Sequence, residues 1–143
     1  MKHSASNFNN DYDVTQINVV FEEVSELEDT SLAIIHWQPL YDLYVSGDDV
    51  IVTIEIAGVA VKDFAMYLGR EYMIIDGIRK SRDVFTGNCC TFHNIEIPYG
   101  RFNRKIDFPV PVEPRQYQYA VNHGILTLKL PCVKEKIIPV EDG

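Results

Sequence analysis

The clearest pattern in the chain is the alternation of apolar and polar residues near its C-terminus. Residues 126–130 read Leu, Thr, Leu, Lys, Leu, and this period of two predicts a half-buried strand that ends at Pro131. Just before it, Asn122-His123-Gly124 is a tight-turn signal, because Gly adopts a positive φ at little cost and Asn tolerates it. Residues 117–121 supply the other arm, so this element is predicted to be a β-hairpin.

Further stretches with strand character lie between residues 41 and 108. They are residues 41–45, 50–56, 64–68, 72–78, 90–97 and 101–108. Turn-forming residues separate them, for example Ser46-Gly47-Asp48-Asp49 and Pro98-Tyr99-Gly100. Short strands at this spacing, with no long helix among them, predict an all-β fold, an antiparallel immunoglobulin-like β-sandwich.

The first 38 residues follow another pattern. Residues 1–13 are polar and Asn-rich, which is typical of disorder. Apolar residues then recur at helical spacing with glutamates on the opposite side: Val14, Ile17, Phe21 and Val24 against Glu22, Glu23 and Glu26. This spacing predicts a short N-terminal amphipathic helix, packed either on its own domain or used for assembly and client capture. A second apolar patch, residues 32–37, precedes Pro39.

Composition narrows the possible partners. A length of 143 residues suits one domain with extensions, and the net charge of −8 argues against binding nucleic acid or an anionic membrane surface. No apolar run approaches the roughly 20 residues needed to span a bilayer, and the N-terminus lacks a signal-peptide core. Three cysteines, an odd number, argue against a disulfide framework and favour a reducing, cytoplasmic location.

The sequence offers little evidence for a catalytic or metal-binding site. Cys89, Cys90 and His93 are close in sequence, but adjacent residues of a strand point to opposite faces and a structural zinc needs four ligands. Reduced thiols are the expectation, with a regulatory thiol as the minor alternative. No nucleophile context and no phosphate-binding loop is found. The sequence therefore predicts no metal, no cofactor, no catalytic residues and no enzyme activity.

Several motifs, in order, resemble the α-crystallin domain of small heat shock proteins of the non-animal type. They are Ile56-Ala57-Gly58-Val59, Ile74-Ile75-Asp76-Gly77-Ile78-Arg79, Phe92-His93-Asn94-Ile95-Glu96, Tyr99-Gly100-Arg101-Phe102-Asn103-Arg104 and Gly124-Ile125-Leu126-Thr127-Leu128-Lys129-Leu130-Pro131. Ala57 departs from the Pro that the family usually has there. The resemblance implies a variable, partly disordered arm at 1–38, the α-crystallin domain at 39–131 and a C-terminal tail at 132–143.

The resemblance also gives the tail a role. Ile138, Pro139 and Val140 are similar to the family's Ile-x-Ile/Val motif, which docks in a groove of a neighbouring subunit. Residues 138 and 140 would point the same way, and Pro139 would stiffen the segment. The groove would lie between residues 64–68 and 117–121, lined by Met66, Leu68 and Ala120. Two questions stay open: whether Met66 and Leu68 are ordinary core residues, and which alternate residues of 117–121 face the groove.

A dimer interface is implied in the same way. In the non-animal branch, the loop at residues 81–96 carries a short strand that pairs with the edge strand of a partner, giving a swapped dimer. The recipient would be Leu43, Tyr44 and Val45, and the loop would contribute Phe92, His93 and Glu96. Arg104 would form an ion pair near this interface, with Glu96 or Asp42, or else be a solvated surface residue.

The function that the resemblance implies is that of an ATP-independent holdase chaperone. Its partners would be other copies of itself, in swapped dimers and higher homo-oligomers, and partly unfolded client proteins. The main rival is a CS-type co-chaperone or interaction adaptor built on a related sandwich. Such domains lack both the swapping loop and the Ile-x-Val tail, so residues 81–96 and 138–140 argue against it.

Overall fold

The computed structural model describes residues 17–21, 35–81 and 90–134, and within these ranges it contains eight strands. They are β1 (Asn18–Phe21), β2 (Tyr41–Ser46), β3 (Asp49–Glu55), β4 (Phe64–Leu68), β5 (Tyr72–Arg79), β6 (Gly100–Asp107), β7 (Gln118–Asn122) and β8 (Ile125–Pro131). Two single-turn 3₁₀ helices, η1 (Val61–Asp63) and η3 (Pro114–Gln116), precede β4 and β7.

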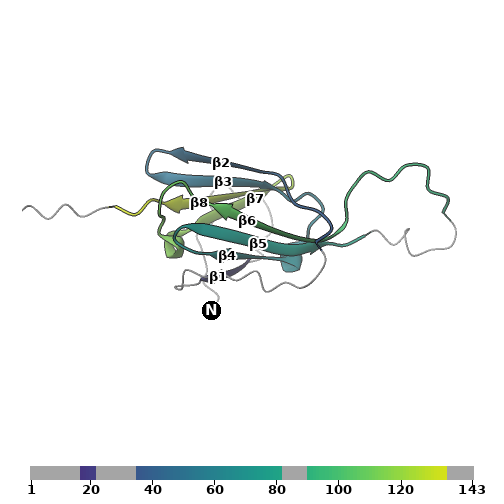
Figure 1. Ribbon diagram of the computed structural model, residues 1–143, viewed down its shortest axis with the longest axis horizontal. Coiled ribbons are helices and arrows are strands. Elements are labelled where there is room, and N and C mark those ends of the chain that lie inside the picture. Colours follow the sequence, from purple (N-terminus) through teal and green to yellow (C-terminus); the bar gives the residue numbers. More distant parts are fainter. Residues whose placement is uncertain (1–16, 22–34, 82–89, 135–143) are drawn as a thin grey trace, which may run out of the picture.

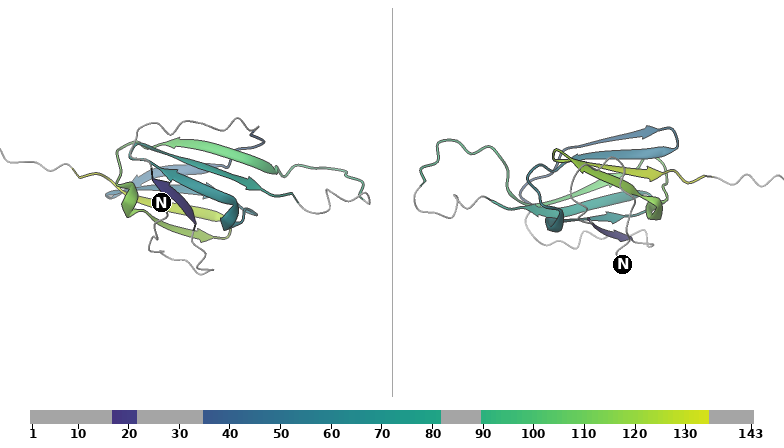
Figure 2. Two further views of the ribbon diagram at one scale, coloured as in Figure 1. Left: turned by 90° about the horizontal axis from the view of Figure 1, so that it is seen from below. Right: turned by 180° about the vertical axis from the view of Figure 1, so that it is seen from behind.

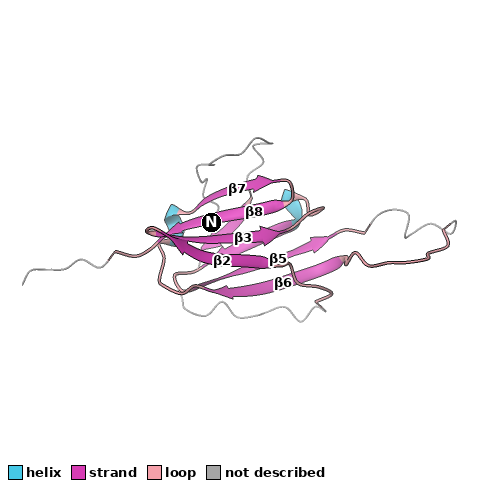
Figure 3. Ribbon diagram, turned by 90° about the horizontal axis from the view of Figure 1, so that it is seen from above, coloured by secondary structure: helices cyan, strands magenta, loops and turns pink. Residues whose placement is uncertain are grey.

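The strands form two four-stranded sheets that pack face to face as a sandwich (Figure 1). One sheet has the order β2-β3-β8-β7, and these strands lie side by side in the upper layer (Figure 3). The other has the order β1-β4-β5-β6. Every strand pair is antiparallel except β1 with β4, which is parallel. The predicted all-β sandwich is confirmed.

One apolar core fills the space between the sheets. Strand alternation turns Leu126, Leu128 and Leu130 of β8 inward, and all three are fully buried. The opposite sheet supplies buried residues from each of its strands: Val19, Phe64, Met66, Leu68, Met73, Ile75, Phe102 and Ile106. Burial of this apolar surface is the main force that holds the two layers together.

The predicted closing hairpin is also confirmed. His123 and Gly124 both have positive φ, 52° and 79°, as a two-residue type I′ turn requires. The turn rests on the bend that follows β3, where the backbone N–H of Ile56 donates to the carbonyl of Gly124 at 2.8 Å. A Cβ on Gly124 would lie only 2.8 Å from the Cα of Ala57, so this close approach requires glycine.

The predicted N-terminal helix is wrong where the structure describes it. Residues 18–21 form β1, and Ile17 and Val19 are buried against the core. Ile17 and Phe21 fit a helical period, but Ile17, Val19 and Phe21 also fit a period of two, and the β-branched Val20 favours a strand. The free edge of β4 decides between them, since only a strand can use its hydrogen-bonding groups. Residues 1–16 and 22–34 lie outside the described part.

A second difference concerns residues 90–97, which were expected to be extended and strand-like. In the single chain they form no strand and, with residues 98 and 99, project away from the sandwich (Figure 1). A strand needs a partner for its backbone N–H and C=O groups, and the described part of one chain supplies none here. Residues 82–89, the rest of the predicted loop, lie outside the described residues.

Candidate functional site

The first candidate site is the edge of the sandwich where β4 and β7 face each other. On β4, the side chains of Phe64, Met66 and Leu68 point into the core and are fully buried or nearly so. Met66 and Leu68 were predicted to line a groove at this edge. In the structure the outer edge of β4 is taken by β1, which runs beside it in the same sheet with Val19 opposite Met66 (Figure 2).

β1 fills this edge with alternate apolar side chains. Ile17 and Val19 are 2% and 1% exposed, and both belong to the core cluster. Phe21 reaches the opposite layer, where its ring centroid lies 5.6 Å from that of Tyr117. The guanidinium of Arg115 lies 5.1 Å from the same Phe21 ring. β1 therefore connects β4 with the residues that lead into β7.

Tyr117 and Tyr119 form the β7 side of this edge. Their rings stack at 6.4 Å with an interplanar angle of 19°, and both residues belong to the core cluster. Burial raises the pKa of the Tyr117 hydroxyl, and the nearby Tyr119 raises it further. Ala120 is buried too, but strand alternation turns it to the face opposite Tyr119. Its predicted contact with a docked tail stays a prediction.

The second candidate site is the outer edge formed by β2. Among the described strands β2 pairs only with β3, so its other side is an open sheet edge. Leu43 packs against the core, whereas Tyr44 and Val45 are about half exposed, at 49% and 48%. An unpaired sheet edge can accept another strand, and the role of these residues as recipients of a partner strand stays a prediction.

The loop predicted to swap carries large apolar side chains that are exposed to solvent. Phe92, Ile95 and Ile97 are 47%, 58% and 56% exposed. His93 and Glu96, the two polar residues predicted to join the interface, are exposed as well, and Glu96 accepts a hydrogen bond from the side chain of Asn94. Exposed apolar residues gathered on one projecting segment are typical of an interaction surface.

Arg104 lies beside the start of β2. Its Nη1 donates to the carbonyl of Pro39 at 2.7 Å, and its guanidinium lies 4.4 Å from the centre of the Tyr41 ring. Within the described chain no ion pair joins Arg104 to Glu96 or Asp42, the two predicted carboxylates. The Arg104 side chain is therefore held by a backbone carbonyl and an aromatic ring. Its guanidinium has further N–H donors besides the one bound to Pro39.

Arg79 is a residue whose importance the sequence did not reveal. It is only 6% exposed, and it donates from Nε to the carbonyl of Ala57 at 2.9 Å and from Nη1 to that of Pro98 at 3.0 Å. Its guanidinium also lies 3.9 Å from the centre of the Trp37 ring. Arg79 thus ties the base of the projecting loop to the end of β5. Its only sequence signal was its place after Gly77 in a family motif.

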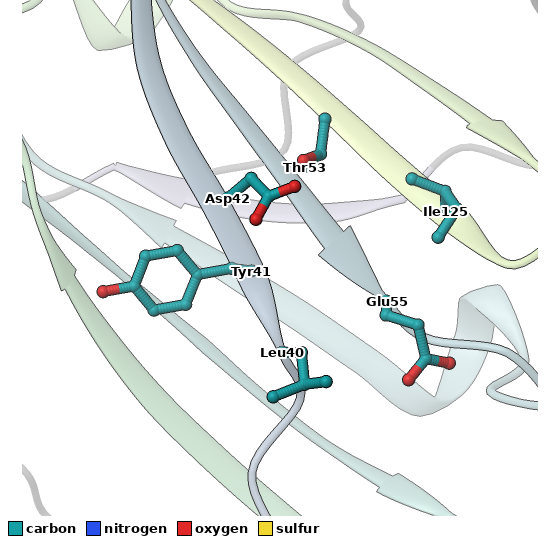
Figure 4. Close-up of a pocket in the computed structure, with 6 residues that line it drawn as sticks. All are labelled: Leu40, Tyr41, Asp42, Thr53, Glu55 and Ile125. Carbon is teal, nitrogen blue, oxygen red and sulfur yellow. The ribbon is translucent and has the colours of Figure 1, made fainter.

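A shallow hollow of about 230 Å³ lies on the outer face of the β2 sheet (Figure 4). Its lining residues are Leu40, Tyr41, Asp42, Thr53, Glu55 and Ile125. Asp42 and Thr53 are cross-strand partners whose side chains point toward each other, while the Tyr41 ring extends to the other side. No hydrogen bond joins the Thr53 hydroxyl to the Asp42 carboxylate, and the lining contains no His, Cys or Lys, so these residues do not form an activated nucleophile.

Metal and membrane features are absent from the ranges that the structure covers. No group of three or more His, Cys, Asp or Glu residues is placed to hold a metal ion there. Cys90 and Cys132 are free thiols, and Cys89 lies outside the described residues. No described helix has the length and apolar character needed to cross a membrane.

Comparison with known proteins identifies the fold through structure alone. Neither a protein-family model nor a curated protein matches the chain. Heat shock protein 16.0 from Schizosaccharomyces pombe matches with a TM-score of 0.62 at 23% identity, over 73% of this chain and 99% of that one. A small heat-shock protein from Xylella fastidiosa gives 0.63 at 20% identity, over 76% and 98%. HSP18.5 from E. histolytica gives 0.56 at 24% identity, over 73% and 98%.

These matches establish the fold of this chain. Its two-sheet sandwich is the α-crystallin type found in small heat shock proteins, and the resemblance predicted from the motifs is confirmed at the level of the fold. The site residues on the tail, groove and loop stay predictions, and residues 138–140 lie outside the described part.

Proposed function

We propose that this protein is an ATP-independent holdase chaperone, which binds partly unfolded proteins and keeps them from aggregating. The observation that carries the proposal is the sandwich fold shared with small heat shock proteins from S. pombe and X. fastidiosa. Its partners are other copies of itself and unfolding clients; it is not an enzyme and uses no cofactor. The net charge of −8 disfavours nucleic acid and anionic membranes as partners. Free thiols at Cys90 and Cys132 suit the cytoplasm.

The basic assembly unit is a swapped dimer. The open edge of β2 offers backbone groups to a new strand, and the projecting loop offers an extended segment with exposed apolar side chains. We assign Leu43, Tyr44 and Val45 of one copy and Phe92, His93 and Glu96 of the other to this interface. Pairing removes an exposed edge and covers the apolar loop in the same step.

Arg104 positions the recipient strand of that dimer. Its bond to the Pro39 carbonyl and its place over Tyr41 brace the segment that leads into β2. The remaining donors of the guanidinium are available for a carboxylate brought by the partner's loop, and Glu96 is the candidate. An intermolecular pair of this kind would fix the register of the swapped strand.

Dimers assemble further through their tails. Ile138 and Val140 dock side by side into the edge between β4 and β7 of a neighbouring copy, near Met66, Leu68 and Ala120. Burying the two side chains contributes about 3–6 kcal/mol at roughly 1.5–3 kcal/mol each, much of which is offset by ordering the tail. Each tail therefore binds weakly, and many tails together hold an oligomer that still exchanges subunits.

Release of weak contacts is the switch that permits client binding. Warming or dilution frees tails, and this exposes the edge between β4 and β7 together with other apolar surface. Leu40 and Ile95 are already 71% and 58% exposed in the single chain. Partly unfolded proteins present apolar segments of their own, so these surfaces bind them before they aggregate.

The test is the suppression of aggregation without nucleotide. A heat-labile client enzyme is warmed with increasing amounts of this protein, and light scattering is followed with no ATP present. We expect scattering to fall strongly near equal subunit amounts, whereas an unrelated acidic globular protein at the same mass leaves it unchanged. Scattering that stays at the control level even with a large excess of the protein would refute the holdase function.

A further inference from the structure

β1 carries the same side-chain pattern as the C-terminal motif. Ile17-Asn18-Val19 and Ile138-Pro139-Val140 both place a β-branched residue on either side of one intervening residue. In an extended segment, residues two apart point to the same face. In β1 that face is turned into the sandwich, where Ile17 and Val19 are almost fully buried.

The edge that β1 uses has room for one strand. β1 pairs with β4 in register from Asn18 opposite Ala65 to Phe21 opposite Leu68, so it occupies the outer hydrogen-bonding side of β4. Met66 and Leu68 are fully buried while β1 is in place. A strand edge pairs with one neighbour at a time, and therefore a second Ile-x-Val segment cannot lie there together with β1.

β1 also has features that make its replacement by another segment easy. It is only four residues long, and β4 is its one sheet neighbour among the described strands. Short edge strands with few contacts open more readily than central ones, and parallel pairs are slightly less stable than antiparallel pairs. If β1 left and nothing replaced it, the core beside Met66 and Leu68 would lose the apolar cover of Ile17 and Val19, so an incoming segment with the same apolar spacing is favoured over an empty edge.

We propose that β1 and the tail motif of a second copy are alternative occupants of this one groove. β1 closes the groove within its own chain, and the tail of a neighbour docks only where β1 has left β4. This inference rests on the tail docking proposed above, and it adds a way in which the N-terminal arm regulates that docking. The N-terminal arm sets how many grooves are open to tails, and thereby the size of the assembly.

The first experiment measures competition directly. A fluorescent peptide of residues 134–143 is titrated against the full chain carrying Ile138→Gly and Val140→Gly, so that its own tail does not compete, and anisotropy is read. Adding Ile17→Ser and Val19→Ser should tighten peptide binding at least tenfold. Val20→Ser, on the other face of β1, is the matched control and should leave the affinity unchanged. Circular dichroism establishes that each variant keeps its β-sheet signal.

Two outcomes would overturn the proposal. One leaves tail docking intact, and the other overturns tail docking as well. Equal peptide affinity with and without the β1 substitutions would show that the arm and the tail do not compete, while tail docking itself would stand. Absence of peptide binding to every variant would overturn the competition and the proposed docking together. Aggregation suppression by the parent protein would still report on the holdase function separately.

A second experiment holds β1 on β4 with a reversible disulfide, so that its result does not depend on substitutions that destabilise β1. Asn18 and Ala65 lie directly opposite each other on neighbouring strands, and a strand spacing of about 4.8 Å falls within the Cα separation that a disulfide spans. The lock combines Asn18→Cys and Ala65→Cys with serine in place of the native cysteines, Cys89, Cys90 and Cys132. Oxidation should weaken peptide binding at least tenfold, and reduction should restore it. Binding that is unaffected by oxidation would contradict the exchange.

Discussion

Replacing Arg79 by Ala should destabilise the sandwich more than any surface charge replacement. The side chain is 6% exposed, and it connects three segments that are distant in sequence: Trp37, Ala57 and Pro98. Glu55 is a weaker partner, since its carboxylate lies 3.8 Å away and its side chain is 45% exposed. The contacts to the two carbonyls and the ring therefore determine how much stability the protein loses when Arg79 is replaced.

Each hydrogen bond to a charged group contributes about 1.5–3 kcal/mol, and a partly buried cation–π contact about 1–2 kcal/mol. The gross sum for Arg79 is roughly 4–8 kcal/mol, from which the desolvation of the guanidinium must be subtracted. Loss of the side chain also leaves the carbonyls of Ala57 and Pro98 without their donor. We expect Arg79→Ala to lower the free energy of unfolding by about 3 kcal/mol, and Arg79→Lys by about half as much because Lys lacks the planar fork.

The assay is urea unfolding followed by tryptophan fluorescence, since Trp37 lies against the altered site. All samples are held at one subunit concentration, because assembly adds to apparent stability. Arg101→Ala is the matched control: Arg101 is partly exposed and paired with Asp76 at 3.1 Å, so its loss should change stability by less than about 1 kcal/mol. An Arg79→Ala variant as stable as Arg101→Ala would refute this reasoning.

Ile138→Gly with Val140→Gly should reduce the native mass to that of dimers, and an unchanged mass would exclude the tail as an assembly device. Gly77→Ala should lower stability by about 2–3 kcal/mol, because a Cβ there lies 2.6–2.7 Å from its neighbours. Gly47→Ala, at φ +60° in open space, should lose only about 1 kcal/mol, and equal losses in urea unfolding would contradict the packing argument. The raised pKa of Tyr117 favours its protonated form in the folded state, so stability should fall as pH rises above about 10. Tyr117→Phe should flatten that fall, and an unchanged pH profile would exclude Tyr117 as its source.

The regular strands could be predicted because their patterns are local. The alternation in β8 and β3 follows directly from one face being buried, and the bounds of β4 agree with the prediction residue for residue. The hairpin turn was equally readable, since His123 and Gly124 need positive φ and the sequence supplies Gly where the backbone is most constrained.

The features that could not be predicted depend on contacts between distant segments. β1 is a strand because β4 has a free edge beside it, and the local spacing of Ile17 and Phe21 fits a helix as well. Arg79 reaches carbonyls 22 and 19 residues away, which no local pattern encodes. The extended run at 90–97 has no partner strand in the described part of a single chain, so its predicted pairing depends on a second copy.

The central claim is that this sandwich assembles reversibly through its two outer edges. The most direct test is the native mass of the parent protein, measured by multi-angle light scattering across subunit concentrations at two temperatures. We predict an assembly larger than a dimer that loses mass on dilution and on warming, because single tails bind weakly. A strict monomer of 16.4 kDa under all conditions would contradict the account and favour an adaptor of the CS type instead.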